Sequence, residues 1–198
     1  ISTYVIDSKN NGKNTNEFNS IKRSVPIVST LDAAVSNGAE VLILGIAPSG
    51  GKIPEAWFKV IESAISKNLS IINGLHDTLL SKYKNSLKNN QWIWDVRVPQ
   101  FIPEIASGKA AKLKNKRILC VGTDMAVGKM TTSLEMHKWA IEKKINSSFI
   151  ATGQIGITIS GEGIPLDAYK VDHACGAVEQ MILKNQNSDW IFIEGQGS

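Results

Sequence analysis

The stretch Val121-Gly122-Thr123-Asp124-Met125-Ala126-Val127-Gly128-Lys129-Met130-Thr131-Thr132 decides how the C-terminal half of the chain folds. An apolar strand pattern precedes it and a helical pattern follows, so we predict a strand-to-helix turn. Backbone N–H groups and the positive end of the helix dipole meet at such a turn, where they attract phosphate. Gly128 would let the backbone approach closely, and Lys129 would add a point charge. An ordinary turn that contains Gly and Lys is the alternative.

This phosphate loop is predicted to bind a cofactor through Gly122, Thr123, Val127, Gly128, Lys129, Met130, Thr131 and Thr132. It departs from the pattern G-x-x-x-x-G-K-[ST] because five residues separate its glycines and Met130 replaces the hydroxyl that binds Mg²⁺. Thr131 comes next, but one step along a helix turns a side chain by about 100 degrees. Either Thr131 substitutes after a local shift, or Mg²⁺ is held differently or not at all. The motif therefore indicates phosphate first and Mg²⁺-ATP hydrolysis second.

Two further acidic residues are predicted to take part in chemistry. Glu194 ends the apolar strand Trp190–Ile193, where a carboxylate can reach a metal or its water. We therefore assign Thr131 and Glu194 to a Mg²⁺ site, with an exposed terminal Glu as the alternative. Asp124 lies inside the loop, and a carboxylate beside phosphates is costly unless it binds a cation or orients a substrate. Its alternative role is to cap the helix through its neighbours.

Short apolar strands alternate with amphipathic helices along all 198 residues, a length that allows two small domains. This alternation predicts an α/β fold of parallel sheets covered on both faces. The helices are expected at 31–36, 54–67, 77–87, 129–143 and 172–184, with a Gly-rich loop at 153–165. Around Pro99 and Pro103 the pattern lapses. We predict an N-terminal domain over residues 1–104, a linker over 105–116 and a P-loop domain over 117–198.

Other candidate site residues follow strands, at the edge where open α/β sheets bind ligands. Thr152 and Gln154 are predicted to contact the substrate, with plain turn chemistry as the alternative. The loop that contains Ser49, Gly50 and Gly51 is predicted to contact the substrate or the other domain rather than a second nucleotide. His76 follows a strand end and is the histidine that we assign to catalysis. A glycine inside the last predicted helix, Gly176, indicates close packing by a ligand or, as we favour, a neighbouring helix.

Composition excludes several classes of protein. The net charge of +4 comes from scattered Lys and Arg residues, so we expect no nucleic-acid partner. No apolar run is long enough for a membrane helix, and the start carries no export signal. Two distant cysteines indicate neither a disulfide framework nor a zinc site, so we expect a cytoplasmic protein. The chain starts without Met and stops just after a Gly-rich turn, so we expect both ends to be truncated.

The motifs resemble those of known families. Gly122-Thr123-Asp124 with Val127-Gly128-Lys129 is similar to the phosphate loop of dethiobiotin synthetase. Over nearly its whole length the chain resembles the DUF1611 family, including Gly45–Gly51, Gly122–Thr132 and Glu194–Gly197. That resemblance implies a Rossmann-like N-terminal domain and a P-loop C-terminal domain. It also implies N-acetylation of D-glutamate, which is the activity described for some family members.

These observations lead to one expected function and two rivals. We expect an enzyme that binds a phosphorylated adenosine cofactor at the loop and acts on a small-molecule substrate in the cleft between the domains. The resemblance implies acetyl transfer from acetyl-CoA to D-glutamate or a similar D-amino acid, and the loop could hold the phosphates of coenzyme A. The rivals are a Mg²⁺-ATP-dependent ligase that activates a carboxylate, and a nucleotide-binding module without turnover. A homo-oligomer is left open.

Overall fold

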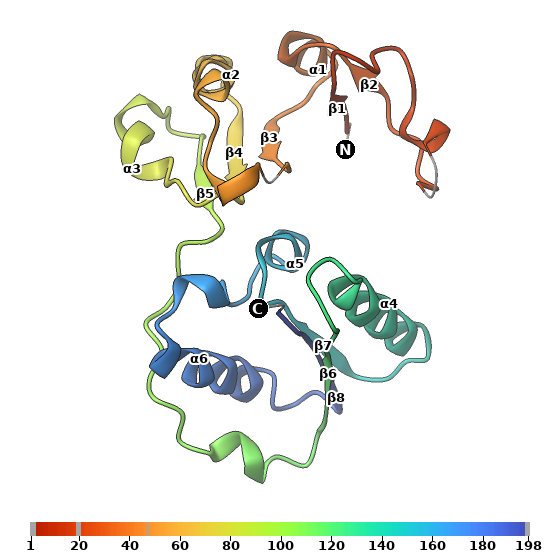
Figure 1. Cartoon of the computed structure of the whole chain (residues 1–198), viewed down its shortest axis with the longest axis vertical. Helices are drawn as coiled ribbons and strands as arrows, with labels where there is room; N and C mark the ends of the chain where they lie inside the picture. The colour runs from red at the N-terminus through yellow and green to blue at the C-terminus, as the bar shows by residue number, and fades with distance from the viewer. Residues whose placement is uncertain (1–2, 19–20, 47, 197–198) are drawn as a thin grey trace. The chain divides into compact units, whose positions relative to one another are not determined.

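The computed structural model describes residues 3–18, 21–46 and 48–196, and it divides into two units between Asp95 and Val96 (Figure 1). Each unit is built on parallel strands with helices packed against them. The predicted α/β class with two parallel-sheet domains is therefore confirmed.

The first unit holds a three-stranded parallel sheet in the order β3-β4-β5. These strands span Val41–Leu44, Ser70–Asn73 and Ile93–Asp95. Helix α2 (Glu55–Ser66) starts after Pro54 and buries one face at Ile61, Ala64 and Ile65. A separate parallel pair joins β1 (Val5–Ile6) to β2 (Ile27–Val28), next to helix α1 (Leu31–Ser36). Short 3-10 helices span Thr15–Glu17 (η1) and Ser49–Gly51 (η2).

The predicted helix over residues 77–87 is wrong in its length. The structure has helix α3 at Leu80–Tyr83 and a 3-10 helix, η3, at Lys84–Ser86. The carboxylate of Asp95, at the end of β5, accepts hydrogen bonds from the N–H groups of Leu79 and Leu80 and so fixes where α3 begins. Asn and Ser compete with helical hydrogen bonding, which is consistent with the early end of the helix.

The second unit has a parallel sheet in the order β6-β8-β7. The strands span Lys116–Cys120 (β6), Trp190–Glu194 (β8) and Ser147–Ile150 (β7). Helix α4 (Lys129–Glu142) packs on all three strands, and helix α6 (Val171–Lys184) shares a core with β7 and β8. Because β8 lies in the middle, its last residue comes next to the ends of both neighbours. That arrangement places Glu194 level with Cys120 of β6.

The Gly-rich stretch 153–165 was predicted to be a loop, and that prediction is wrong. Residues Gln154–Ser160 form helix α5, which ends at Gly161 with a left-handed φ of 81°. The carboxylate of Glu194 accepts the N–H of Gly153 at the start of this helix. A negative charge at a helix N-terminus is stabilising, so a contact from a distant strand favours the helix. A short 3-10 helix, η5, follows at Leu166–Ala168.

Residues 101–112, called the strap below, lie along α6. Four residues in or just before α6 contact the strap. Three of them form hydrogen bonds: the Tyr169 hydroxyl donates to Phe101 O, His173 pairs with Pro103 O, and Glu179 accepts the N–H groups of Ser107 and Ala110. The fourth, Gly176, leaves room for the backbone of Glu104.

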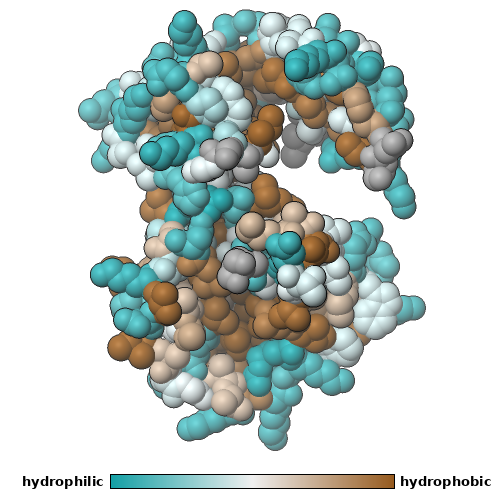
Figure 2. All heavy atoms as spheres, in the orientation of Figure 1, coloured by the Kyte–Doolittle hydropathy of each residue, from teal (hydrophilic) through white to brown (hydrophobic). Residues whose placement is uncertain are grey.

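The neighbour of Gly176 is thus an extended segment, neither the helix that we favoured nor a ligand. Residues 105–116, where a linker was predicted, include the 3-10 helix η4 (Lys109–Lys112), which packs on α6. The exact domain boundaries stay a prediction. Hydrophobic side chains reach the surface in both units (Figure 2), and in the strap the most exposed are Ile102 and Ile105.

Candidate phosphate-binding site

The predicted phosphate loop connects the end of β6 to the start of α4, as the sequence indicated. The backbone turns through left-handed conformations at Ala126 (φ 55°) and Gly128 (φ 95°). A Cβ on Gly122 would lie only 2.5 Å from Cγ2 of Val127 and 3.1 Å from Cγ of Lys129. The first glycine of the motif therefore lets the later part of the loop fold back over it.

Unused N–H groups gather where this loop enters α4. In the part of the chain that the structure describes, the N–H groups of Gly128, Lys129, Met130 and Thr131 donate no hydrogen bond, whereas Thr132 already donates to Gly128 O. They belong to the N-cap residue and the first turn of a helix of 14 residues. Free N–H groups and a positive dipole end at one place make an anion-binding site.

The side chains of Lys129 and Asp124 are both engaged within the loop. Lys129 Nζ donates to the main-chain oxygen of Asp124 at 2.5 Å. The carboxylate of Asp124 accepts the N–H of Met125 at 2.7 Å. Asp124 is exposed, so the structure gives it a turn-stabilising contact, and its predicted catalytic role stays a prediction.

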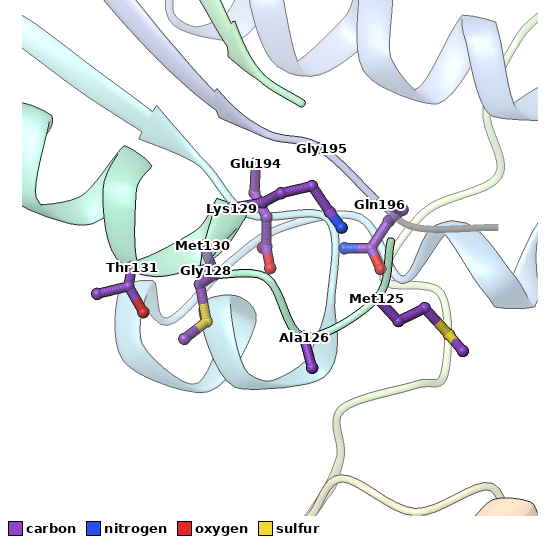
Figure 3. A pocket seen from close by; sticks show the side chains of 9 residues that line it. All are labelled: Met125, Ala126, Gly128, Lys129, Met130, Thr131, Glu194, Gly195 and Gln196. Carbon is purple, nitrogen blue, oxygen red and sulfur yellow. The ribbon is translucent and has the colours of Figure 1, made fainter. Parts of the chain in front are cut away.

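A cavity of about 360 Å³ opens beside the loop (Figure 3). Its lining combines the loop and the first turn of α4 with the end of β8, and consists of Met125, Ala126, Gly128, Lys129, Met130, Thr131, Glu194, Gly195 and Gln196. This volume lies within the usual range for small-ligand sites. Of the predicted cofactor-binding residues, four line the cavity and four (Gly122, Thr123, Val127 and Thr132) do not.

Glu194 is buried at the end of β8, with 6% of its surface exposed. Its Oε2 accepts hydrogen bonds from the N–H groups of Thr152, at 2.9 Å, and Gly153, at 3.2 Å. Burial raises the pKa of the Glu194 carboxyl, although these N–H groups, Gln196 and the charge of Lys129 lower it in part. The result is a carboxylate with a raised pKa that faces the cavity.

Glycines make the space that Glu194 occupies. A Cβ on Gly156, in the first turns of α5, would collide with Oε2 of Glu194, and a Cβ on Gly153 would lie 3.3 Å from its Oε1. Gly195 likewise lets β8 approach the main-chain oxygen of Cys120, to which its N–H donates at 3.1 Å. The Gly-rich composition of this region is thus explained by one buried carboxylate and one close strand pair.

The two predicted substrate residues after β7 differ in their surroundings. Thr152 is 1% exposed, and its hydroxyl donates to Glu194 O and accepts from Gln196 Nε2. The hydrogen and one lone pair of its hydroxyl are therefore used within the protein, and its contact with a substrate stays a prediction. Gln154 is the first residue of α5 and does not line the cavity. Its contact with a substrate stays a prediction.

The predicted Mg²⁺ site finds limited support in the geometry. Thr131 lines the cavity, but its side chain projects away from Lys129 in Figure 3. Oε2 of Glu194 is already held by two N–H groups, which leaves one carboxylate oxygen for a cation. Among the described residues, no three His, Cys, Asp or Glu side chains gather as a metal cluster. A metal at this place would depend on ligands from phosphate and water.

In the first unit the structure brings together four other predicted site residues. Gly50 and Gly51 have left-handed φ angles of 78° and 65° in the loop after β3. The main-chain N–H of His76 donates to Gly51 O at 2.9 Å, and the imidazole ring of His76 fills the space that a Cβ on Gly51 would need. Ser49 belongs to the same short helix, η2. The catalytic role of His76 and the substrate contacts of this loop stay predictions.

Four cavity residues were not predicted as site residues, namely Met125, Ala126, Gly195 and Gln196, and of these Gln196 has the polar side chain. It lies two residues after Glu194 in the segment Glu194-Gly195-Gln196, where the alternation of a continued strand would turn its side chain to the same face. The two-residue spacing from Glu194 was therefore the sequence signal that could have identified Gln196.

The fold and the site together define a P-loop α/β protein with a second, Rossmann-like unit, and two family matches agree. Residues 104–198 match the family described as "Domain of unknown function (DUF1611_C) P-loop domain", and residues 8–99 match "Domain of unknown function (DUF1611_N) Rossmann-like domain". The chain belongs to the DUF1611 family.

Similar proteins include two named D-glutamate N-acetyltransferase. The one from Pseudoalteromonas sp is 42% identical over 168 residues (83% of this chain and 50% of the relative), and the one from Tritonibacter scottomollicae is 41% identical over 172 residues (85% and 51%). The chain thus spans about half the length of the curated relatives it matches. A crystal structure of a DUF1611 family protein from Anabaena variabilis superimposes with a TM-score of 0.94 at 44% identity, over 99% of this chain and 58% of that one.

Within the described ranges, none of the helices combines the length and the apolar character needed to span a membrane.

Proposed function

We propose that this chain is part of an enzyme that transfers the acetyl group of acetyl-CoA to the amino group of D-glutamate or a similar D-amino acid. The observation that carries the proposal is the cluster of unused N–H groups at Gly128–Thr131 beside Lys129, in a cavity that also contains a buried carboxylate. The names of the two relatives at 42% and 41% identity supply the reaction and the substrate.

The residues of the loop suit the phosphates of coenzyme A. Lys129 and the free N–H groups of the first turn of α4 would hold phosphate oxygens, which accept hydrogen bonds and carry negative charge. When bound, acetyl-CoA would supply an acetyl group activated as a thioester. Lys129 would then anchor the carrier and not take part in bond making, so a hydroxyl at Met130 is not required.

Glu194 would serve as the general base. Its raised pKa makes the carboxylate a better proton acceptor than an ordinary Glu. In the overall reaction the amine nitrogen bonds to the acetyl carbon and the carbon–sulfur bond breaks. The amine proton would go to Glu194, and Glu194 would return it to the thiolate of the leaving coenzyme.

The test is thiol release from acetyl-CoA by the full-length protein when D-glutamate is added. We expect release that depends on the D-amino acid and does not require Mg²⁺. ADP formation that requires both Mg²⁺ and a carboxylate substrate would instead support a ligase. Tight nucleotide binding without turnover would support a binding module, and either result would overturn the proposal.

A further inference from the structure

The hydroxyl of Thr152 determines which way the amide of Gln196 points. That hydroxyl donates to the main-chain oxygen of Glu194 at 2.7 Å. Because a hydroxyl has a single hydrogen, only its lone pairs remain for Gln196, whose Nε2 lies 2.9 Å away. The nitrogen of the amide must therefore face Thr152, and the oxygen must face the other way. Thr152 is 1% exposed, so water does not compete for this contact.

The amide nitrogen of Gln196 is also close to Glu194. A Cβ on Gly153 would lie 2.7 Å from Gln196 Nε2 and 3.3 Å from Glu194 Oε1, so both atoms border one small space. The Gln196 side chain lowers the pKa of the Glu194 carboxyl. With the nitrogen engaged by the protein, Oε1 is the polar atom of Gln196 that remains. Figure 3 shows that oxygen turned towards Met125, on the cavity side.

Glu194 presents its second oxygen to the same cavity. Oε2 faces the N–H groups of Thr152 and Gly153, whereas Oε1 lies next to Gln196. Glu194 Oε1 and Gln196 Oε1 are thus two acceptor oxygens at the same cavity, one of them on a carboxylate. Such a pair suits a cationic group with several N–H donors, and it repels a carboxylate or phosphate.

We propose that Glu194 and Gln196 form a binding subsite for a primary ammonium group, and that Thr152 is the positioning residue that sets both acceptors. This inference rests on the proposed function, since it identifies the place where the amino group of the D-amino acid binds. It also divides the cavity: the phosphates lie at the first turn of α4, and the amine lies at the end of β8.

The experiment compares D-glutamate with glutarate, the same dicarboxylate without the amino group, by calorimetry on the full-length protein without acetyl-CoA. We expect D-glutamate to bind at least tenfold more tightly than glutarate, which is about 1.4 kcal/mol. Thr152→Val, which keeps the shape but lacks the hydroxyl, should reduce this ratio below about threefold. Thr152→Ser, which keeps the hydroxyl, should retain it.

Gln196→Met provides a second test at an exposed position, so it does not depend on whether Thr152→Val folds. It should also reduce the ratio. Equal binding of the two ligands, no binding of D-glutamate, or a ratio unchanged in both Thr152→Val and Gln196→Met would overturn the inference. A protein that discriminates as expected but releases no thiol from acetyl-CoA would refute the proposed function and leave the ammonium subsite intact.

Discussion

The ammonium group of Lys129 donates a hydrogen bond of 2.5 Å to the main-chain oxygen of Asp124, so this lysine folds back over its own loop. The cation is thereby held next to the N–H groups of Gly128–Thr131, which donate to no other group in the described part of the chain. A bound phosphate would find the charge and the N–H groups already in place, with little ordering left to occur.

We predict that Lys129→Ala weakens binding of acetyl-CoA at least tenfold, or about 1.4 kcal/mol, because a point charge on the phosphates is lost. Calorimetry on the folded full-length variant measures this. Lys138→Ala is the matched control, since Lys138 is an exposed lysine of the same helix. Equal affinity of the Lys129→Ala variant and the wild type would refute the assignment of the lysine.

Gly122→Ala should also weaken acetyl-CoA binding, because the new Cβ would lie 2.5 Å from Val127 Cγ2 and displace the loop. The double variant Gly122→Ala/Val127→Ala removes that methyl group and should recover part of the affinity. The same titration checks both variants. Full affinity in the single variant, or no recovery in the double one, would argue against this packing.

The acid limb of the pH–rate profile should report the protonation of the Glu194 carboxylate. Burial raises the pKa of this carboxyl from its ordinary value of 4.5, so the base is lost as the pH falls through a value above 4.5. Thr152→Val should move the limb to still higher pH, because it removes the contact that holds the Gln196 side chain, and that side chain lowers the pKa of Glu194. The measurement is kcat/KM against pH. A limb at or below 4.5, or one that persists in Glu194→Gln, would contradict the role of Glu194.

Gly176→Ala should destabilise the protein by about 1–3 kcal/mol, although Gly to Ala inside a helix ordinarily gains about 1 kcal/mol. The cause is the backbone of Glu104, which occupies the place of the new Cβ. Urea unfolding gives the value. Cys175→Ala, at an exposed neighbouring position, should stay within about 0.5 kcal/mol of the wild type. A stabilised Gly176→Ala variant would mean that the strap does not lie on α6.

Attachment of the strap should weaken in acid. Hydrogen bonds from the N–H groups of Ala110 and Ser107 lower the pKa of Glu179 below its ordinary 4.5. A depressed carboxyl pKa stabilises the folded state above the ordinary value, and this contribution is lost as the pH falls through the lowered one. Amide hydrogen exchange, corrected for intrinsic rates, measures this. Protection of the Ser107 and Ala110 amides should drop in that pH range in the wild type, and at neutral pH in Glu179→Gln. Glu142→Gln, on α4, should leave both amides protected.

Short sequence patterns predicted those parts of the fold whose structure depends mainly on neighbouring residues in the sequence. Alternating apolar strands and amphipathic helices predicted the parallel sheets of both units, and the turn before Lys129 predicted the phosphate loop. Glu194 was predicted from its place at a strand end, and it does line the cavity. In each case the pattern lies within one short segment: either apolar residues recur at a regular spacing, or a glycine and a charged residue stand at a fixed spacing.

The errors arose where a distant group decides the local structure. Gly153 and Gly156 indicated a loop, but they give room to the carboxylate of Glu194, which in turn supports α5. Gly176 indicated close packing, but nothing near it in sequence shows that its neighbour is the strap. Thr152 follows a strand, but nothing near it in sequence shows that it is buried by contacts with β8.

The most direct test of the central claim compares acetyl-CoA with S-acetyl-pantetheine, which has the same thioester but no phosphates, as ligands of the full-length protein. If the N–H groups at Gly128–Thr131 hold phosphate, acetyl-CoA should bind at least tenfold more tightly to the wild type, and Lys129→Ala should lose most of that advantage. Equal binding of the two thioesters to the wild type would contradict the account.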